Sequence, residues 1–225
     1  MNWPNNASWS AGQHEKIAGA GEQKVFTWVV ECGTLYLPSG RLVVCDPFAF
    51  MRQRGNPRVI VPPGRFPVTV TLADVSEQLD RRHVREAYAS IVFDTAPESY
   101  RVALPLVREG EEAPVLDDGE YVGFRVDAGT ACFVDEASLA TCMPDERAWL
   151  EDLFENERED CWFRRMDDPG HIREGLANIQ LPLANDGENI VIIHSGWGDG
   201  VYPVIGSFDA KRKLLAVHID FLVVQ

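Results

Sequence analysis

The feature that most constrains this fold is a succession of short runs of β-branched and aromatic residues, each bounded by turn residues. Such side chains pack well on a pleated sheet, and short runs of them between turns are typical of strands. The runs predicted as strands cover residues 25–30, 33–37, 41–45, 65–72, 87–93, 100–104, 121–126 and 130–134. The turn residues at 38–40 predict a β-hairpin between the second and third of these runs.

A single main helix is predicted near residues 145–158. Asp145 is placed to accept backbone N–H groups at its start, and acidic residues in the first turn suit the helix dipole. The apolar residues Trp149, Leu150, Leu153 and Phe154 recur three and four positions apart and form one stripe. Many short strands with few helices predict an α+β protein that is mostly antiparallel β-sheet, arranged as a sandwich or a half-barrel.

The predicted domain organisation is simple. Residues 1–22 are rich in Asn, Ser, Gly and Ala without a clear period, and we expect a loosely ordered N-terminal segment there. Residues 23–225 are expected to form a single α+β domain, because a chain of this length can bury one well-packed core. We expect this domain to end in a three-stranded antiparallel meander over residues 189–224, with strands at 189–194, 201–208 and 213–224.

The meander predicts which side chains share a face. If its loops close simple hairpins, the opposite pairs are His194 with Val201, Ile193 with Tyr202, Val201 with Asp220 and Pro203 with His218. Because side chains alternate along a strand, His194, His218 and Asp220 are then expected on one face. The other face, formed by Tyr202, Val204, Val217, Ile219 and Phe221, is expected to pack in the core.

The trio His194, His218 and Asp220 permits three interpretations and supplies the candidate catalytic groups. Two imidazoles and a carboxylate can hold Zn²⁺ or Fe²⁺, although a one-residue bulge would separate them. A histidine with a pKa near neutrality, paired with Asp220, can act as a general acid or base. The third interpretation is structural: a histidine that is hydrogen-bonded at the sheet surface.

The glycine-rich stretch 194–202 is the candidate binding loop. Its three glycines indicate special backbone angles or the close approach of another group. Ser195 does not match the nucleophile elbow of lipases, which needs glycines where Ile193 and Trp197 stand and a helix after the serine. The strand predicted after the loop also excludes a dinucleotide-binding turn. The residues expected to bind a ligand are Ser195, Trp197, Asp199 and Tyr202.

Four aspartates in or beside turns form the candidate metal site. Asp46 ends a strand, Asp127 and Asp135 flank the run 130–134, and Asp199 lies among the glycines. If these turns converge, their carboxylates can hold Mg²⁺ or Ca²⁺ through oxygen ligands. The competing interpretation is ordinary turn chemistry, since aspartate before glycine or proline is common in turns.

Charge and cysteine content bear on several functional classes. The net charge of −14 argues against a nucleic-acid-binding protein, whose surface must be basic, and suits a cationic partner. No apolar run approaches the roughly 20 residues that span a bilayer, and no signal peptide is visible, so we expect a cytoplasmic protein without a membrane segment. The five cysteines contain no Cys-x-x-Cys pair, which favours buried reduced thiols over a zinc site.

Four segments of the sequence are distinctive. They are GRLVVCDP at 40–47, PGRFPV at 63–68, VDAGTACFVD at 126–135 and SGWGDGVYP at 195–203, with the terminal pair Asp220-Phe221. On these segments the chain resembles an uncharacterised bacterial family, the domain of unknown function 4241. The resemblance implies a soluble bacterial protein of one compact domain and brings no established activity or cofactor. It marks Asp46, Asp127, Asp135 and Asp199 as the first positions to test.

We expect a cytoplasmic, non-catalytic binding or regulatory protein, of which an immunity protein that masks a toxin is one concrete form. Its partner would be a protein or a small molecule. The strong acidity, the lack of a complete catalytic motif and the aromatic residue in the Trp197 loop favour this expectation. The alternative is a metal-dependent hydrolase of a phosphorylated or acylated small molecule. It would use the four aspartates as ligands of a divalent metal and His194 or His218 as the base.

Overall fold

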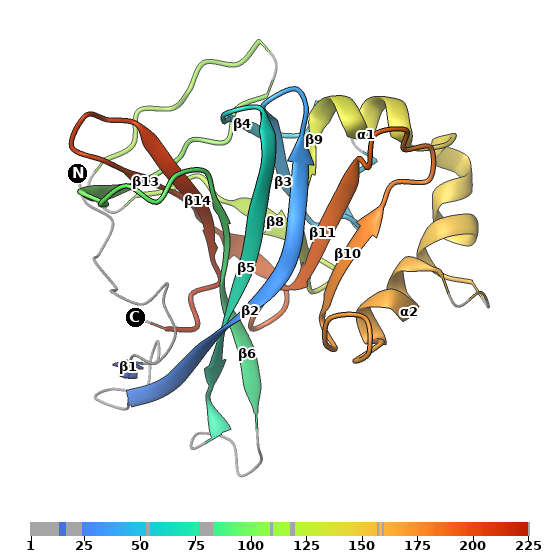
Figure 1. Cartoon of the computed structure of the whole chain (residues 1–225), viewed down its shortest axis with the longest axis horizontal. Coiled ribbons are helices and arrows are strands. Elements are labelled where there is room, and N and C mark those ends of the chain that lie inside the picture. Colours follow the sequence, from blue (N-terminus) through green and yellow to red (C-terminus); the bar gives the residue numbers. More distant parts are fainter. Residues whose placement is uncertain are drawn as a thin grey trace.

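A computed structural model of the chain describes residues 14–16, 24–52, 55–76, 83–108, 110–117, 120–156, 158 and 160–224. These residues form a β-rich fold of antiparallel sheets with a few short helices (Figure 1). The N-terminal segment predicted to be loosely ordered, 1–22, lies outside the described residues apart from the short strand β1 (His14–Lys16). Within the described residues, no helix is both long and apolar enough to cross a bilayer.

The larger sheet has seven strands in the order β1-β2-β5-β6-β14-β13-β7. The strands that follow β1 in this order are β2 (Lys24–Leu37), β5 (Gly64–Asp74), β6 (Val84–Val92), β14 (Leu214–Asp220), β13 (Val204–Phe208) and β7 (Tyr100–Ala103). The runs predicted at 25–30 and 33–37 are one long strand, β2. Its register shifts between Glu31 and Thr34, where Gly33 has a φ of 79° that favours glycine.

The second sheet has five strands in the order β10-β11-β9-β3-β4, and a third sheet pairs β12 with β8. The five strands are β10 (Leu176–Gln180), β11 (Asn189–His194), β9 (Thr130–Asp135), β3 (Arg41–Cys45) and β4 (Arg58–Ile60), and the pair is β12 (Gly200–Tyr202) with β8 (Phe124–Val126). All six residues of β9 are buried, which is expected of a central strand that is covered on both faces.

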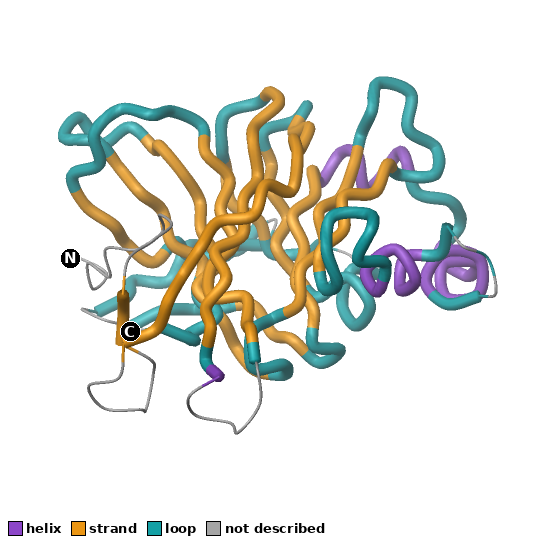
Figure 2. Tube along the Cα trace, turned by 60° about the horizontal axis from the view of Figure 1, so that its bottom comes forward, coloured by secondary structure: helices purple, strands orange, loops and turns teal. Residues whose placement is uncertain are grey.

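The five-stranded sheet is the middle of three layers. Along β11, Val191 and Ile193 belong to a core shared with the seven-stranded sheet, whereas Ile190 and Ile192 belong to a second core shared with the helices. Side chains that alternate along a strand thus serve two cores at once. Figures 1 and 2 show the helices gathered on one side of the strands. The predicted sandwich arrangement is confirmed, and the described sheets do not close into a barrel.

The prediction of one main helix at 145–158 is wrong in part. The helical segments are α1 (Glu136–Cys142), a 3₁₀ turn (Glu146–Ala148), a π-helical stretch (Trp149–Phe154) and α2 (Trp162–Asp167). Asp145 does cap its segment, accepting the N–H of Arg147 at 3.0 Å. The π turn, closed by a bond from Glu155 N–H to the Leu150 carbonyl, brings residues five apart to one side. It therefore lets Trp149 and Phe154 both pack into the second core.

The predicted hairpin between 33–37 and 41–45 is wrong. Its first strand is part of β2 in the seven-stranded sheet, and its second is β3 in the five-stranded sheet. The N–H and hydroxyl of Ser39 donate to Asp135 at the end of β9, at 3.0 and 2.7 Å. Gly40 follows with a φ of 65°. The turn at 38–40 therefore passes the chain from one sheet to the other.

The predicted C-terminal meander is also wrong, although its core face is confirmed. β11 pairs with β9 and β10, and β12 pairs with β8, so only β13 and β14 form a hairpin. Within it His218 lies opposite Ile205, two residues from the predicted partner Pro203, which has no N–H to continue a ladder. The predicted core side chains Tyr202, Val204, Val217, Ile219 and Phe221 all belong to the core between the sheets.

Candidate functional site

The glycine-rich loop is a tight turn that two hydroxyl groups hold in place. The N–H of Gly198 donates to the Ser195 carbonyl at 3.1 Å, and the N–H of Ser195 donates to the Gly129 carbonyl at 3.0 Å. The hydroxyls of Ser195 and Tyr202 both donate to the Gly198 carbonyl, each at 2.8 Å. Both side chains are buried, and burial raises the pKa of the Tyr202 phenol. These two candidate binding residues therefore shape the loop from inside.

Gly196 fixes the loop against the core and leaves Trp197 outside. A Cβ on Gly196 would lie 2.8 to 2.9 Å from three atoms, one of them the backbone oxygen of Glu86, and its φ is 60°. Only glycine fits such a position without displacement. Trp197 is 43% exposed, and the Cζ atom of Arg85 lies 5.4 Å from its ring centroid, within reach of a cation–π contact. The loop thus presents an indole beside a guanidinium.

Asp46 ties together the strand ends beneath this loop. Its buried carboxylate accepts hydrogen bonds from the N–H groups of Phe48, Ala49, Asp127 and Ala128 and from the hydroxyl of Thr130. Asp199 accepts the N–H of Gly129 at 3.2 Å. The turns that carry Asp46, Asp127 and Asp199 therefore converge, as the metal-site prediction required, but their contacts run to backbone groups.

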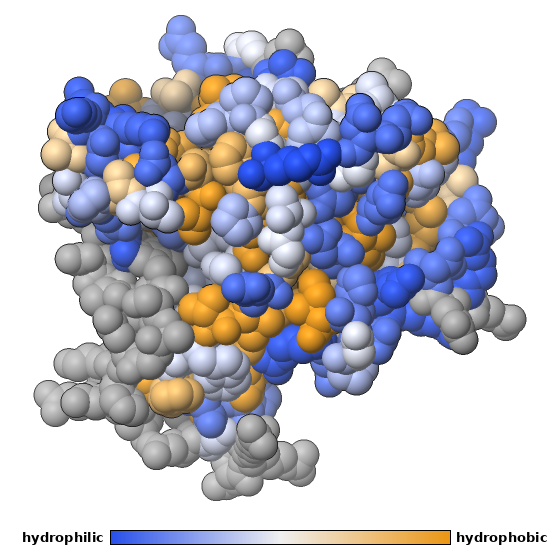
Figure 3. Space-filling model, viewed as in Figure 1, coloured by the Kyte–Doolittle hydropathy of each residue, from blue (hydrophilic) through white to orange (hydrophobic). Residues whose placement is uncertain are grey.

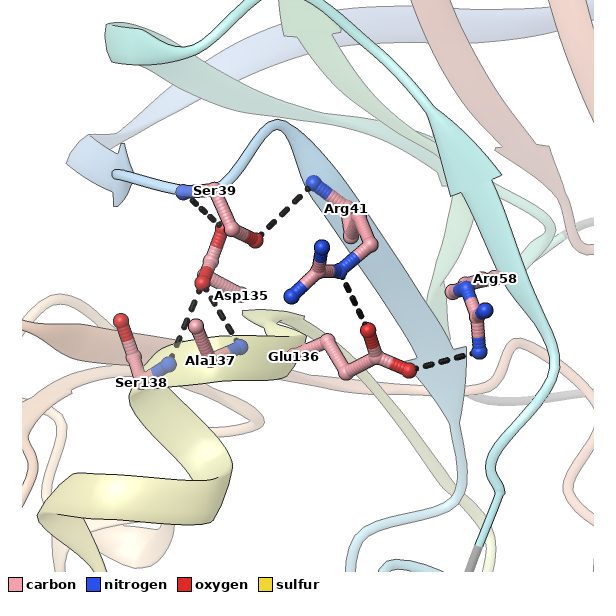
Figure 4. A network of polar contacts seen from close by, with 7 residues as sticks. All are labelled: Ser39, Arg41, Arg58, Asp135, Glu136, Ala137 and Ser138. Carbon is pink, nitrogen blue, oxygen red and sulfur yellow. Dashed lines mark hydrogen bonds and ion pairs between the residues drawn. The ribbon is translucent and has the colours of Figure 1, made fainter. Parts of the chain in front are cut away.

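Asp135 lies at the opposite end of β9 (Figure 4). One carboxylate oxygen accepts two N–H groups in the first turn of α1, and the other accepts the N–H and hydroxyl of Ser39. A strand rises about 3.3 Å per residue, so Asp135 is roughly 16 Å along β9 from Thr130, which contacts Asp46. The four predicted aspartates are therefore divided between two ends of the sheet.

The contacts of these aspartates are those of caps and turns. Asp127 is exposed and pairs with Arg125 at 3.4 Å, while Asp46, Asp135 and Asp199 accept hydrogen bonds from the chain itself. Among the residues that the structure describes, no three His, Cys, Asp or Glu side chains are placed to hold a metal ion. The competing interpretation, turn chemistry, accounts for each observed contact.

The trio of His194, His218 and Asp220 does not form as the predicted register required. His218 and Asp220 are buried on β14 of the seven-stranded sheet, and His194 ends β11 of the other sheet. Both ring nitrogens of His218 lie 2.8 Å from serine hydroxyls, those of Ser90 and Ser207. Burial lowers the pKa of His218 to about 3. His218 is therefore a neutral, hydrogen-bonded residue, as in the structural interpretation, but it is buried and not at the sheet surface.

Two adjoining pockets that share Arg85 and His194 form a groove, which we call the His194 groove. The first, of about 560 Å³, lies between β2, β6 and the turn before β10, and its lining includes Trp28, Leu72, Glu86 and Arg173. The second, of about 300 Å³, lies beside the glycine-rich loop, and its lining includes Trp197, Asp167 and Gly129. Figure 1 shows β2 and β6 extending past the end of β11, where the two sheets diverge. The groove joins the predicted Trp197 loop to residues that the sequence analysis did not select.

Glycine at position 175 brings Glu86 and His194 together in the groove. A Cβ there would lie 2.6 Å from His194 Nδ1 and 3.2 Å from Glu86 Oε1, and the φ of Gly175 is 88°. Burial raises the pKa of Glu86 to about 7, although Arg173 and Arg85 oppose the shift. Burial also lowers the pKa of His194. At neutral pH the groove therefore holds an uncharged imidazole next to a carboxyl group that is only partly ionised.

A β-bulge explains why sequence periodicity missed Glu86. Tyr88 lies opposite Thr71, but Glu86 lies opposite Leu72, so one extra residue of β6 interrupts the ladder. Without the bulge, Glu86 would share a face of the sheet with Tyr88, because residues two apart on a strand point the same way. The bulge turns it inward beside Leu72 and Trp28. The sequence signal that remains is the charged pair Arg85-Glu86 directly before a predicted apolar strand.

Comparison with known proteins identifies the family of the chain, but the function of that family is unknown. A family model described as a protein of unknown function (DUF4241) matches residues 35–219, which include the glycine-rich loop and most of both large sheets. No curated protein and no solved structure matches the chain. The groove residues Arg85, Glu86, Arg173, His194 and Trp197 all fall within the matched range.

Proposed function

Since the chain belongs to the DUF4241 family, whose function is unknown, we propose a function from the geometry of the His194 groove: a non-catalytic protein that binds its ligand there. The observation that carries the proposal is that Arg85 and His194 line both pockets. They lie between the half-exposed indole of Trp197 in one pocket and the buried carboxyl of Glu86 in the other. Ligand sites typically hold a few convergent polar groups of perturbed pKa, and Glu86 and His194 are such groups here.

The roles of the reactive side chains support binding over catalysis. The Ser195 hydroxyl donates to a loop carbonyl, and His218 is held between two serines. The carboxylates of Asp46 and Asp135 are engaged in buried hydrogen bonds. Each of these candidate catalytic or metal-binding groups is therefore already engaged in holding the fold together.

We further propose that the protein acts in the cytoplasm. All five cysteines are free and buried. Cys45 and Cys132 lie on neighbouring strands with their sulfur atoms 3.7 Å apart, yet they are present as two thiols. Unpaired thiols are usual in a reducing compartment.

The test of the binding function compares what wild-type protein and Trp197→Ser retain from a native lysate of the source cells. Mass spectrometry would quantify the proteins and the small molecules that remain bound to each of the two proteins. Val201→Ser is the matched control, because Val201 is 52% exposed on β12 and does not line the groove. We expect wild type and the control to retain a common molecule that Trp197→Ser loses. If no retained molecule depends on Trp197, the groove is not the binding site.

A second candidate, a hydrolase of acylated or phosphorylated small molecules, is favoured by one observation. Glu86 and His194 approach each other in the groove, and the pKa of about 7 for Glu86 suits proton transfer at neutral pH. Glu86→Gln keeps the size of the side chain and removes its acid–base function. Turnover of acyl and phosphate esters that is lost in Glu86→Gln, with ligand affinity retained, would favour the hydrolase over the binding protein.

A further inference from the structure

Two buried nitrogen atoms in the first pocket of the His194 groove have no hydrogen-bond partner. They are Arg85 Nε and His83 Nε2, and neither has a partner among the described residues. Both side chains line the same pocket. Buried polar groups in native proteins nearly always have a partner, so two exceptions in one pocket indicate atoms that a ligand satisfies.

The chemistry of these groups defines what the ligand must present. A guanidinium can only donate hydrogen bonds, so the atom that meets Arg85 Nε must be an acceptor. Arg173 lines the same pocket and adds a second positive charge. Paired guanidinium N–H groups match the two oxygens of a carboxylate in geometry and charge.

The pocket also has partly exposed apolar side chains. Trp28 and Val30 of β2 line it and pack against the core between the sheets, to which the fully buried Leu72 of β5 belongs. A volume of about 560 Å³ is within the usual range for small-molecule sites. A ligand that fills this pocket therefore has an apolar body next to its acidic head.

The remaining charges in the groove favour a single negative charge on the ligand. Glu174 and the buried Glu86 line this pocket, and Asp167 lines the adjoining one. A doubly charged phosphate would be repelled by these carboxyl groups more strongly than a singly charged carboxylate, which is costly in a partly buried site. Protonated Glu86 can instead donate a hydrogen bond to the second oxygen of a carboxylate.

We propose that the His194 groove binds a small monocarboxylate with an apolar tail, its carboxylate held by Arg85 and Arg173 and its tail against Trp28 and Val30. This inference rests on the proposed binding function and names the class of ligand. It involves no chemical step. The carboxylate supplies the acceptor that Arg85 Nε lacks, and the tail leaves water for the apolar side chains.

The test is calorimetric titration of the full chain with matched pairs of probes. Phenylacetate and hexanoate carry the proposed carboxylate, and phenylacetamide and hexanamide have the same shape without the charge. Because a charge-assisted hydrogen bond is worth roughly twice a neutral one, we expect the carboxylates to bind about tenfold more tightly than the amides. Inorganic phosphate, the third probe, is expected to bind more weakly than either carboxylate.

Arg85→Met is the variant that isolates the guanidinium, because methionine keeps much of the apolar stem. We expect it to lower the affinity for phenylacetate about tenfold. Arg41→Met is the matched control, since Arg41 pairs with Glu136 in a different cavity (Figure 4). It is expected to bind phenylacetate as wild type does. Thermal melts of both variants identify any loss of folded protein.

Three outcomes separate this inference from the proposed function. Equal binding of the amides and carboxylates, or an unchanged affinity in Arg85→Met, overturns the ligand class. If no carboxylate binds while Trp197→Ser still loses a retained molecule, the groove is a binding site for another class of ligand. If no carboxylate binds and no retained molecule depends on Trp197, the ligand class and the binding function are both wrong.

Discussion

Burial sets the charge of individual side chains in this protein, and it acts in opposite senses on acids and bases. It raises the pKa of the Glu86 carboxyl to about 7 and lowers that of the His218 imidazole to about 3. Both groups are thereby moved toward their uncharged forms. Both ring nitrogens of His218 are hydrogen-bonded to serine hydroxyls, whereas the Glu86 side chain lines a pocket. The difference in partners, more than the size of the shift, separates the structural residue from the functional candidate.

Glu86→Gln tests the raised pKa of Glu86 through stability. Because the folded pKa is above the unfolded value of about 4.5, the protonated form favours folding. The stabilisation from the protonated carboxyl is complete below pH 4.5, the unfolded pKa, and is lost as the pH rises through about 7, the folded pKa. The variant lacks this loss, so its stability relative to wild type should grow by about 2–3 kcal/mol between pH 4.5 and pH 8. Urea unfolding of both proteins across this range measures it. A difference that does not change with pH would show that Glu86 titrates normally.

At the scale of elements, a turn and a bulge place the groove residues. The turn at 195–198 holds Gly196 against the core and projects Trp197, and the bulge in β6 brings Glu86 inward. The sequence did predict the loop, because three glycines in a β context are a strong local signal. It could not predict the bulge, since the position of an extra residue depends on the partner strand and not on the periodicity of β6 itself.

Gly196→Ala and Gly198→Ala form a matched pair that tests the turn. Alanine at 196 adds a Cβ into contacts of 2.8 to 2.9 Å at a φ of 60°, whereas alanine at 198, with a φ of 97°, meets no atom within 4 Å. We expect Gly196→Ala to cost about 2–4 kcal/mol, the sum of backbone strain and overpacking. Gly198→Ala should cost about 1–2 kcal/mol from the backbone alone. Chemical denaturation measures both, and equal losses would show that the turn does not depend on the close fit at Gly196.

At the scale of the molecule, the pairing of strands was the part that the sequence predicted least well. Most strand positions were correct, and β11 matches its prediction at both ends. The error lay in assuming that strands joined by a turn are partners. β2 and β3, and likewise β11 and β12, are neighbours in sequence but belong to different sheets. Turn residues indicate a local change in chain direction. Which strands pair depends instead on burying both faces of the middle sheet.

The shared middle layer predicts that the two cores unfold together. Ile192 faces the helices, whereas its neighbours on β11 face the other sheet. We expect Ile192→Ala to lower stability by about 2–4 kcal/mol. We also expect the substitution to accelerate amide exchange at Val217 on β14, in the other core, by the same factor as at Ile190 beside the substituted residue. Hydrogen exchange followed by NMR measures both sites. Faster exchange confined to the helical layer would contradict a single cooperative unit.

The surface of the molecule is mostly polar on the face shown in Figure 3, with apolar residues visible between polar ones. On a chain with a net charge of −14, Arg85 and Arg173 place two guanidinium groups in a pocket that Glu86 and Glu174 also line. Such local charge gives an anionic ligand a favoured site on an otherwise repulsive molecule. We therefore expect a small anionic ligand to bind in the His194 groove.

The most direct measurement is an NMR titration of the full, ¹⁵N-labelled chain with phenylacetate, followed at two tryptophan indole N–H signals. Trp197 lines the groove, and Trp149 is an internal control because its indole N–H donates to the Pro144 carbonyl at 2.9 Å in the helical layer. Binding in the groove predicts that the Trp197 indole and the Gly175 amide shift together while the Trp149 signal stays in place. A titration that leaves Trp197 and Gly175 unchanged, or that moves Trp149 instead, would contradict the binding of a monocarboxylate in the groove.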